Sequence, residues 1–150
     1  MSPTHPADQP DSLAILMIED NEDDALLLLR RFKLAGYRVD SERVFTTAAM
    51  TKALGARDWD VIISDHNMPG FDALAALDII KTRALDVPFI IVSGHIDEDT
   101  AISAMRAGAH DYLNKNNLER LLPAVERELR EARNRHERRQ ALATLQENEA

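Results

Sequence analysis

The sequence has no cysteine, and no apolar run reaches the roughly 18 residues needed to span a bilayer. The lack of cysteine excludes a disulfide framework and any metal or catalytic site built on a thiolate, and it fits a cytoplasmic protein. The lack of a long apolar run leaves no candidate membrane span. No G-x-G-x-x-G pattern follows the first apolar stretch, which argues against dinucleotide binding. No G-x-x-x-x-G-K-[ST] pattern is present, which excludes a P-loop nucleoside triphosphatase.

Positive charge is scarce over most of the chain, whose formal net charge is −8. Residues 1–116 carry 19 acidic and 11 basic side chains, whereas residues 117–150 carry seven of each. An acidic body argues against nucleic acid as a direct partner, because phosphate contacts need a basic face. Residues 1–11 contain three prolines and no basic or apolar segment, so they predict a disordered leader rather than a signal peptide.

A short β-branched run, Val61 to Ile63, predicts a buried strand that ends at Asp65. Met68, Pro69 and Gly70 then stop the strand. In an open α/β sheet, reactive groups lie where strands end at their carboxyl edge, so Asp65 would face a crevice there. Taken alone, Asp65 is more simply explained as the cap of the turn that follows. Polar groups at the ends of three other predicted strands favour the functional interpretation.

The remaining segments alternate between strand-like and helix-like patterns. The expected strands cover residues 13–18, 38–44, 59–64, 88–92 and 110–113. The expected helices cover residues 22–35, 46–56, 73–84 and 97–108, and a last one begins near residue 118. This alternation predicts an α/β, doubly wound, five-stranded parallel sheet with helices on both faces. We expect the strand order 2-1-3-4-5 of flavodoxin-like folds.

The last helix is expected to be unusually long. Leu122, Val125, Leu129 and Ala132 are spaced by three and four residues and predict the buried face. A helix that continued to about residue 148 would reach roughly 45 Å, further than one domain covers. Its end is either a solvated, frayed helix or a connector that pairs with a second copy in a parallel dimer, and we favour the connector. We therefore divide the chain into a domain at 12–131 and a helical linker or coiled-coil extension at 132–150.

Four strand ends bring polar side chains to the same edge of the predicted sheet. They are Glu19 with Asp20, Asp65, Ser93, and Lys115. Strands one and three are neighbours in the expected order, so three carboxylates would share one crevice and repel each other unless a cation lay between them. Oxygen ligands of this kind suit Mg²⁺, which tends to bind together with a phosphoryl group. The lysine could pair with a carboxylate or a phosphate, and the serine offers a hydroxyl donor.

Over about residues 13–131, these motifs in this order resemble the receiver domain of two-component response regulators, the CheY-like superfamily. The motifs that carry the resemblance are Glu19-Asp20, Asp65 followed by Met68-Pro69-Gly70, Ser93 after an apolar strand, and Tyr112 followed by Lys115.

The resemblance implies phosphorylation of Asp65 by a histidine kinase, a histidine phosphotransfer protein or a small phosphodonor. It implies Mg²⁺ as cofactor, bound by Glu19, Asp20, Asp65 and the backbone carbonyl of Asn67. Lys115 and Ser93 would stabilise the phosphoryl group, and Ser93 with Tyr112 would form the conformational switch that controls an output domain or protein.

Two other functions are alternatives to this one. An unphosphorylated pseudo-receiver would serve as a constitutive interaction or dimerisation module, but a degenerate site usually lacks a carboxylate or the lysine. A phosphohydrolase with an aspartyl nucleophile would need a second acid two residues after Asp65, where the chain has Asn67. We therefore expect no enzyme in the usual sense, only self-catalysed phosphorylation and dephosphorylation of the aspartate. The attack of Asp65 on phosphorus needs no general base, because an aspartate is ionised at neutral pH.

One position departs from the family pattern, since Asn116 follows Lys115 where a proline, often with a cis bond, is usual. A non-proline cis bond costs about 2.5–4 kcal/mol, so we expect a trans bond and a differently shaped loop. His66 and His95 are expected to be rim residues rather than metal ligands. The final residues, 141–150, resemble linker helices that lead from receivers into output domains, and we expect the chain to be the receiver part of a larger protein.

Overall fold

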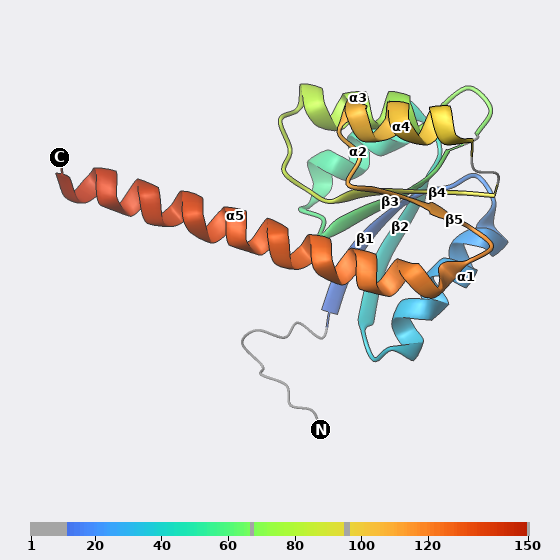
Figure 1. The fold of residues 1–150 in the computed structure, drawn as a ribbon, viewed down its shortest axis with the longest axis horizontal. Coiled ribbons are helices and arrows are strands. Elements are labelled where there is room, and N and C mark those ends of the chain that lie inside the picture. Colours follow the sequence, from blue (N-terminus) through green and yellow to red (C-terminus); the bar gives the residue numbers. More distant parts are fainter. Residues whose placement is uncertain (1–11, 67, 95–96, 150) are drawn as a thin grey trace.

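The computed structural model describes residues 12–66, 68–94 and 97–149. Five parallel strands form one sheet of order β2-β1-β3-β4-β5, as predicted (Figure 1). Because sequence neighbours β2 and β3 lie on opposite sides of β1, the chain reverses its winding direction there. The strands are β1 (Ser12–Ile18), β2 (Arg38–Val44), β3 (Val61–Asp65), β4 (Phe89–Ser93) and β5 (Asp111–Asn114).

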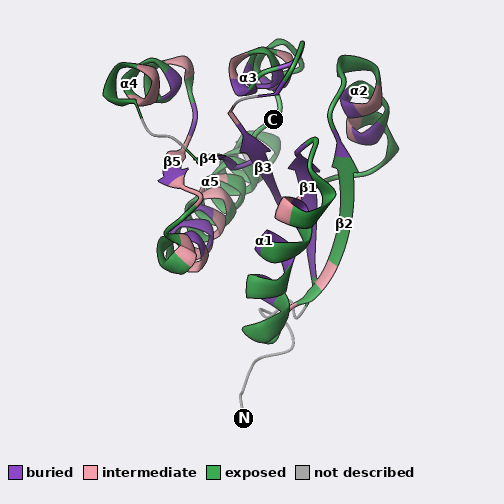
Figure 2. Cartoon of the chain, turned by 90° about the vertical axis from the view of Figure 1, so that its right-hand side faces the viewer, coloured by how far each residue is buried: buried purple, intermediate pink, exposed green. Residues whose placement is uncertain are grey.

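Helices cover both faces of the sheet, which confirms the doubly wound architecture. Helices α1 and α5 pack on one face, and α2, α3 and α4 pack on the other (Figures 1 and 2). They are α1 (Glu22–Leu34), α2 (Thr47–Ala56), α3 (Ala73–Thr82), α4 (Glu98–Ala107) and α5 (Leu121–Glu149), with a 3₁₀ turn, η1 (Leu118–Arg120), before α5. Neighbouring residues of a strand therefore enter different cores: Ile62 packs on the α2–α4 side and Ile63 on the α1 side.

The central strands are buried on both faces, as expected for a parallel sheet. Every residue of β3 and β4 is buried, whereas most of β2 is exposed at the sheet edge (Figure 2). The alternation of polar and apolar residues in β2 suits that edge position. Asn21, Thr46 and Asp72 cap the amino ends of α1, α2 and α3, since each side chain accepts a hydrogen bond from a backbone amide three residues later.

Several predicted boundaries were wrong by one or two residues, and three of these differences have a local reason. Helix α3 ends at Thr82 rather than near Ala84, because Ala84 adopts a left-handed φ of 54°. Strand β3 begins at Val61 rather than at Trp59, whose indole N–H donates to the carbonyl of Ala53 at 3.0 Å. Strand β5 begins one residue after His110, whose Nδ1 accepts a hydrogen bond from the Phe89 amide at 3.0 Å.

Helix α5 has 29 residues, about 44 Å at 1.5 Å per residue, and its predicted extension is confirmed (Figure 1). The predicted buried face was partly wrong. Only Val125 of the predicted stripe is buried, and Leu121, Ala124 and Glu128 complete the true face. The other predicted members, Leu122, Leu129 and Ala132, are half-buried at its margin. Pro123 does not interrupt the helix, because it lies in the first turn, where amides have no helical partner.

A second feature lies at the amino edge of the sheet, opposite the strand ends that carry the predicted site. A pocket of about 220 Å³ opens there between the loops that precede β3 and β4. Its lining includes Leu54, Trp59, Leu85 and Asp86, and the Arg57 guanidinium lies 4.9 Å from the centre of the Trp59 ring.

Within the described residues, no helix combines the length and apolar character required to cross a membrane. The predicted leader, residues 1–11, lies outside the described residues.

Candidate functional site

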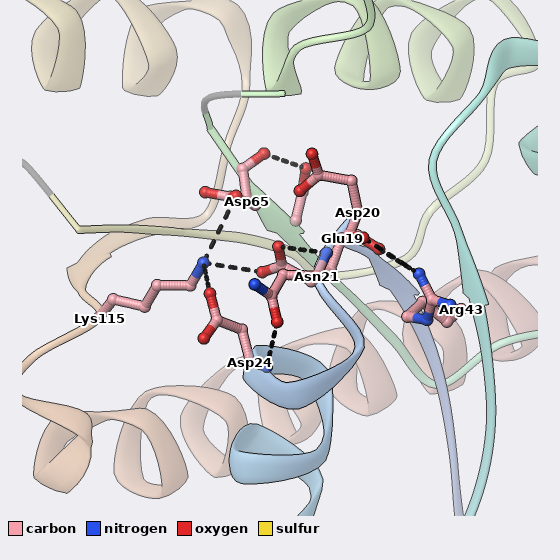
Figure 3. A network of polar contacts seen from close by, with 8 residues as sticks. Glu19, Asp20, Asn21, Asp24, Arg43, Asp65 and Lys115 are labelled. Atoms are coloured by element: carbon pink, nitrogen blue, oxygen red, sulfur yellow. Dashed lines mark hydrogen bonds and ion pairs between the residues drawn. The ribbon is translucent and has the colours of Figure 1, made fainter. Parts of the chain in front are cut away.

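Three carboxylates predicted from the sequence meet at the carboxyl edge of the sheet. Strands β1 and β3 are direct neighbours, with Ile18 opposite Ser64, so the residues that follow both strands lie together. Glu19, Asp20 and Asp65 each place a carboxylate oxygen within 4.8 Å of the other two (Figure 3). Glu19 and Asp65 are buried, at 1% and 8% exposure, while Asp20 is exposed to solvent. The cluster is thus open on one side.

Backbone contacts fix the first part of this cluster. The Glu19 amide donates to the carbonyl of Val44 at 3.0 Å, which continues the β1–β2 ladder by one residue. The Glu19 carboxylate accepts from the Asn21 amide at 3.2 Å. Arg43 Nη1 donates to the backbone carbonyls of Glu19 and Asp20, at 3.2 and 3.4 Å. Sequence reasoning missed Arg43, although its place one residue before the end of β2 puts it at the same sheet edge.

Lys115 is the cation of the site. Its Nζ lies 2.8 Å from Glu19 Oε1, 2.9 Å from Asp24 Oδ2 and 3.4 Å from Asp65 Oδ2 (Figure 3). The proximity to Asp65 and Glu19 is as the sequence predicted. Sequence reasoning missed Asp24, because the helix dipole already favours an acidic side chain in the first turn of a helix and so gives no sign of a further role. The lysine therefore joins β1, α1, β3 and the β5–α5 loop through one ammonium group.

Burial and pairing shift the acid–base properties of this group of residues. Burial raises the pKa of Glu19 to about 7, and this effect outweighs the hydrogen bond from Lys115. Burial alone lowers the pKa of Lys115, but its hydrogen bonds with Glu19 and Asp24 reverse that effect and leave the pKa above its ordinary value. The lysine is thus a fixed positive charge beside carboxylates that share a partly buried crevice.

Ser93 occupies the predicted position at the end of β4. It is fully buried, and its neighbour Val92 is the register partner of Asp65, so Ser93 lies one residue further along the adjacent strand. Its backbone carbonyl accepts a hydrogen bond from the Lys115 amide at 2.8 Å. Asn67, predicted to offer a backbone carbonyl to the metal, and His95, predicted at the rim, lie outside the described residues.

Tyr112 and His66 form an aromatic pair beside the cluster. Their ring centroids are 5.8 Å apart, and the ring planes are inclined by 60°. Tyr112 is half-buried and packs against the core on the α2–α4 side. Among the described residues, neither the buried Tyr112 hydroxyl nor the buried His66 Nδ1 has a hydrogen-bond partner.

The loop after Lys115 is built without the usual proline. The peptide bond between Lys115 and Asn116 is trans. The side-chain oxygen of Asn114 accepts a hydrogen bond from the Asn116 amide at 2.8 Å, and the backbone carbonyl of Asn114 accepts one from the Asn117 amide at 3.0 Å. An asparagine turn of this kind fixes the chain direction locally, in place of a proline ring.

The comparisons with known proteins agree with this arrangement. The family model described as "Response regulator receiver domain" matches residues 15–126. This chain belongs to the response regulator receiver domain family. The match begins within β1, includes the other four strands and the carboxylate cluster, and ends within the first turns of α5.

The curated relatives that this receiver matches include bacterial transcriptional regulators named DctD and NtrC. Over 119 residues it is 35% identical to the C4-dicarboxylate transport transcriptional regulatory protein DctD of Pseudomonas aeruginosa, covering 77% of this chain and 24% of that protein. The receiver thus spans about a quarter of the length of the curated relative.

Two solved structures show the same fold at 25–30% identity. NtrX from Brucella abortus in complex with ADP has a TM-score of 0.75 and 29% identity, covering 84% of this chain and 29% of that one. The beryllofluoride-activated NtrC4 receiver domain dimer has a TM-score of 0.70 and 28% identity, covering 79% of this chain and 98% of that one.

The residues of this receiver suit the Mg²⁺ that such domains typically bind. Glu19, Asp20 and Asp65 supply hard oxygen donors within a small space, and Asp20 leaves one side open to solvent. Mg²⁺ prefers carboxylate oxygens and retains several waters, which an open cluster accommodates. The donor set contains no sulfur, and its geometry is that of a shared acidic crevice rather than a closed cage.

Proposed function

We propose that this receiver accepts a phosphoryl group on Asp65 from a histidine kinase or a histidine phosphotransfer protein, and that small phosphodonors can substitute for them. The observation that carries the proposal is the convergence on Asp65 of two further carboxylates and the Lys115 ammonium. Mg²⁺ would be held by Glu19, Asp20 and Asp65, with the Asn67 carbonyl as a further ligand. When bound, the ion neutralises charge on the attacking carboxylate and the phosphoryl oxygens.

For this reaction the protein needs mainly to position the reacting groups and to offset the charge on the phosphoryl oxygens. A carboxylate oxygen of Asp65 attacks phosphorus and forms a new P–O bond, while the P–N bond to the donor histidine breaks and its electron pair stays on the imidazole. Lys115, 3.4 Å from Asp65, donates hydrogen bonds to the phosphoryl oxygens as charge spreads over them. Ser93, buried at the end of the next strand, adds its hydroxyl.

The switch follows from differential contacts in the two states. A phosphoryl group on Asp65 draws Ser93 and Lys115 toward it, and only the active arrangement forms those bonds well. Tyr112 then moves into the space beside Ser93. Among the described residues the Tyr112 hydroxyl has no hydrogen-bond partner, and this supports the role, because a second position can supply that hydrogen bond.

The output would leave the receiver along α5. Leu142 and Leu145, at 56% and 58% exposure, lie three residues apart on its distal part. Such a pair suits the seam of a parallel two-stranded coiled coil, so we include a homodimer through residues 132–149 in the proposal. A histidine kinase donor implies that the receiver works in the cytoplasm, and a downstream domain or protein would receive the signal.

The test is the intact mass of the chain after incubation with Mg²⁺ and acetyl phosphate. A gain of one phosphoryl group that is stable in acid, labile in base and missing in Asp65→Asn is the expected result. A wild-type chain that gains no mass and does not bind beryllofluoride would contradict it and favour the constitutive interaction module. Sedimentation with and without beryllofluoride then tests whether activation promotes the dimer.

A further inference from the structure

Asp24 is a fourth carboxylate at the site and lies outside the cluster that suits a metal. Its Oδ2 atom lies 2.9 Å from Lys115 Nζ (Figure 3). Nζ lies 2.8 Å from Glu19 Oε1 and 3.4 Å from Asp65 Oδ2. The Asp24 amide donates to the capping side chain of Asn21 at 3.0 Å, which fixes the backbone that carries the carboxylate. The capped end of α1 therefore presents Asp24 to the lysine.

One ammonium group, that of Lys115, serves three carboxylates. An ammonium has three N–H donors and no acceptor, and here Glu19, Asp24 and Asp65 all surround it. A phosphoryl group on Asp65 brings additional oxygens that also need donors. Asp24 is on α1 and Asp65 is on β3, and Nζ lies 2.9 Å from Asp24 Oδ2 but 3.4 Å from Asp65 Oδ2. We therefore expect the ammonium to weaken its contact with Asp24 as it moves toward phosphoryl oxygens on Asp65.

We propose that Asp24 is a positioning residue that retains the Lys115 ammonium on the α1 side of the site and so opposes its transfer to a phosphoryl group on Asp65. The inference rests on the proposed function, because it concerns the regulation of that same aspartate. Asp24 sets the balance between the resting and phosphorylated arrangements, and its loss favours the phosphorylated one.

The same contact has a structural consequence at the surface. Asp24, Leu27 and Lys115 belong to the lining of a pocket of about 250 Å³ between α1 and the segment that follows β5. The Asp24–Lys115 ion pair joins these two segments. Coupling is reciprocal, so a phosphoryl group that draws Lys115 away from Asp24 also loosens α1 from the β5–α5 loop and alters this pocket.

The first experiment measures beryllofluoride affinity, in the presence of Mg²⁺, for the wild type, Asp24→Asn and Asp23→Asn. Partly exposed ion pairs contribute little, so we expect roughly a two- to fivefold tighter affinity in Asp24→Asn. Asp23 is exposed in the same turn and undergoes the same change in charge, so Asp23→Asn is the matched control and stays near wild type. An affinity of Asp24→Asn equal to or weaker than that of the wild type would overturn the inference.

A general loss of negative charge near the site would also favour binding of an anion. A double-mutant cycle with Lys115 separates this effect from the Asp24–Lys115 contact, here called the tether. In a Lys115→Met background, Asp24→Asn should leave beryllofluoride affinity unchanged, because the tether needs the ammonium. A gain that persists without Lys115, or that Asp23→Asn reproduces, would show simple charge repulsion and refute the positioning role.

A ligand-free measurement distinguishes failure of this inference from failure of the proposed function. Without Mg²⁺ or beryllofluoride, the decrease in Tm of Asp24→Asn combined with Lys115→Met should be smaller than the sum of the two single decreases. Additive decreases would exclude the tether itself. If the variants show this coupling but the wild type never binds beryllofluoride, the proposed function is refuted, and with it the regulatory role of Asp24. The contact between Asp24 and Lys115 would still be established.

Discussion

The carboxylate of Asp86 accepts hydrogen bonds from the guanidinium of Arg135, which lies 49 residues further along the chain. The Nη2–Oδ1 distance is 3.0 Å, and Nε lies 3.3 Å from both carboxylate oxygens. Arg139, one turn further along α5, places Nη1 2.9 Å from Asp86 Oδ2. The loop before β4 thus holds α5 at the amino edge of the sheet, and the proposed linker contacts the domain as far as Arg139.

Replacing Asp86 should loosen the middle of α5. Hydrogen bonds from Arg135 hold the pKa of Asp86 below its ordinary value, so the carboxylate is charged at neutral pH and Asp86→Asn removes both ion pairs. Exposed pairs contribute about 0.2–1 kcal/mol each, so we expect amide hydrogen exchange in residues 132–142 to accelerate by a factor of roughly two to five. Asp78→Asn, at an exposed position on α3, is the control. Equal exchange in both variants would show that α5 does not depend on Asp86.

Tyr37 should titrate late and in a way that depends on Glu126. Burial and the 2.7 Å hydrogen bond from its hydroxyl to Glu126 raise the pKa of Tyr37 to about 12. A raised pKa in the folded state means that this contribution to stability is complete below about pH 10 and is lost as the pH rises toward 12. In Glu126→Gln, the pKa should fall part of the way back toward 10.

Tyrosinate absorbance measures this shift, because the chain has two tyrosines and a Tyr112→Phe background leaves Tyr37 alone. The unfolding free energy of the same protein, followed with rising pH, should decline over the same interval. If Glu126→Gln leaves the titration of Tyr37 unchanged, the hydrogen bond makes no contribution and burial accounts for the whole shift.

Asp20→Asn should weaken Mg²⁺ binding without unfolding the protein. The Asp20 side chain is exposed, and Arg43 contacts its backbone carbonyl, which the substitution preserves. Loss of a ligand should cost at least about tenfold in affinity, since changes outside the ligand shell already cost 10–100-fold. Calorimetric titration with Mg²⁺ and a thermal melt give the two readouts. Undiminished Mg²⁺ affinity would place the ion elsewhere than the Glu19–Asp20–Asp65 cluster.

Alanine should have opposite effects at two glycines. Gly55 lies within α2, and a Cβ there would meet nothing closer than Arg83 Nη2 at 3.9 Å, so Gly55→Ala should stabilise the protein by about 0.5–1 kcal/mol. Gly108 ends α4 with a φ of 116°, and a Cβ there would lie 3.0 Å from Lys81 Cε. Gly108→Ala should therefore destabilise the protein by about 1–2 kcal/mol. Urea unfolding of the two variants compares them, and effects of the same sign would contradict this account.

The arrangement of the strand ends was predictable because it depends on local rules. Apolar runs that stop at polar residues predict strands, and parallel strands place those residues at one edge of the sheet. With the expected order 2-1-3-4-5, Asp20, Asp65 and Lys115 could therefore be predicted to lie near one another. The lysine's contact with Asp24 could not, because several acidic residues open α1 and only the rotation of the helix decides which one faces inward. For α5, apolar spacings of three and four residues were compatible with more than one face, and packing against the sheet selected Leu121 over Leu122.

Trp59 gives the molecule an optical consequence of its own. It is the chain's single tryptophan, and it shares the lining of the amino-edge pocket with Asp86, the residue that holds α5. Indole emission depends on the charges and polarity around the ring, here the Arg57 guanidinium and the neighbouring loops. Intrinsic fluorescence therefore reports on the edge where α5 leaves the sheet, and not on the carboxylate crevice at the opposite edge. An emission change on phosphorylation of Asp65 would record a signal that had crossed the whole sheet, observed without any attached dye.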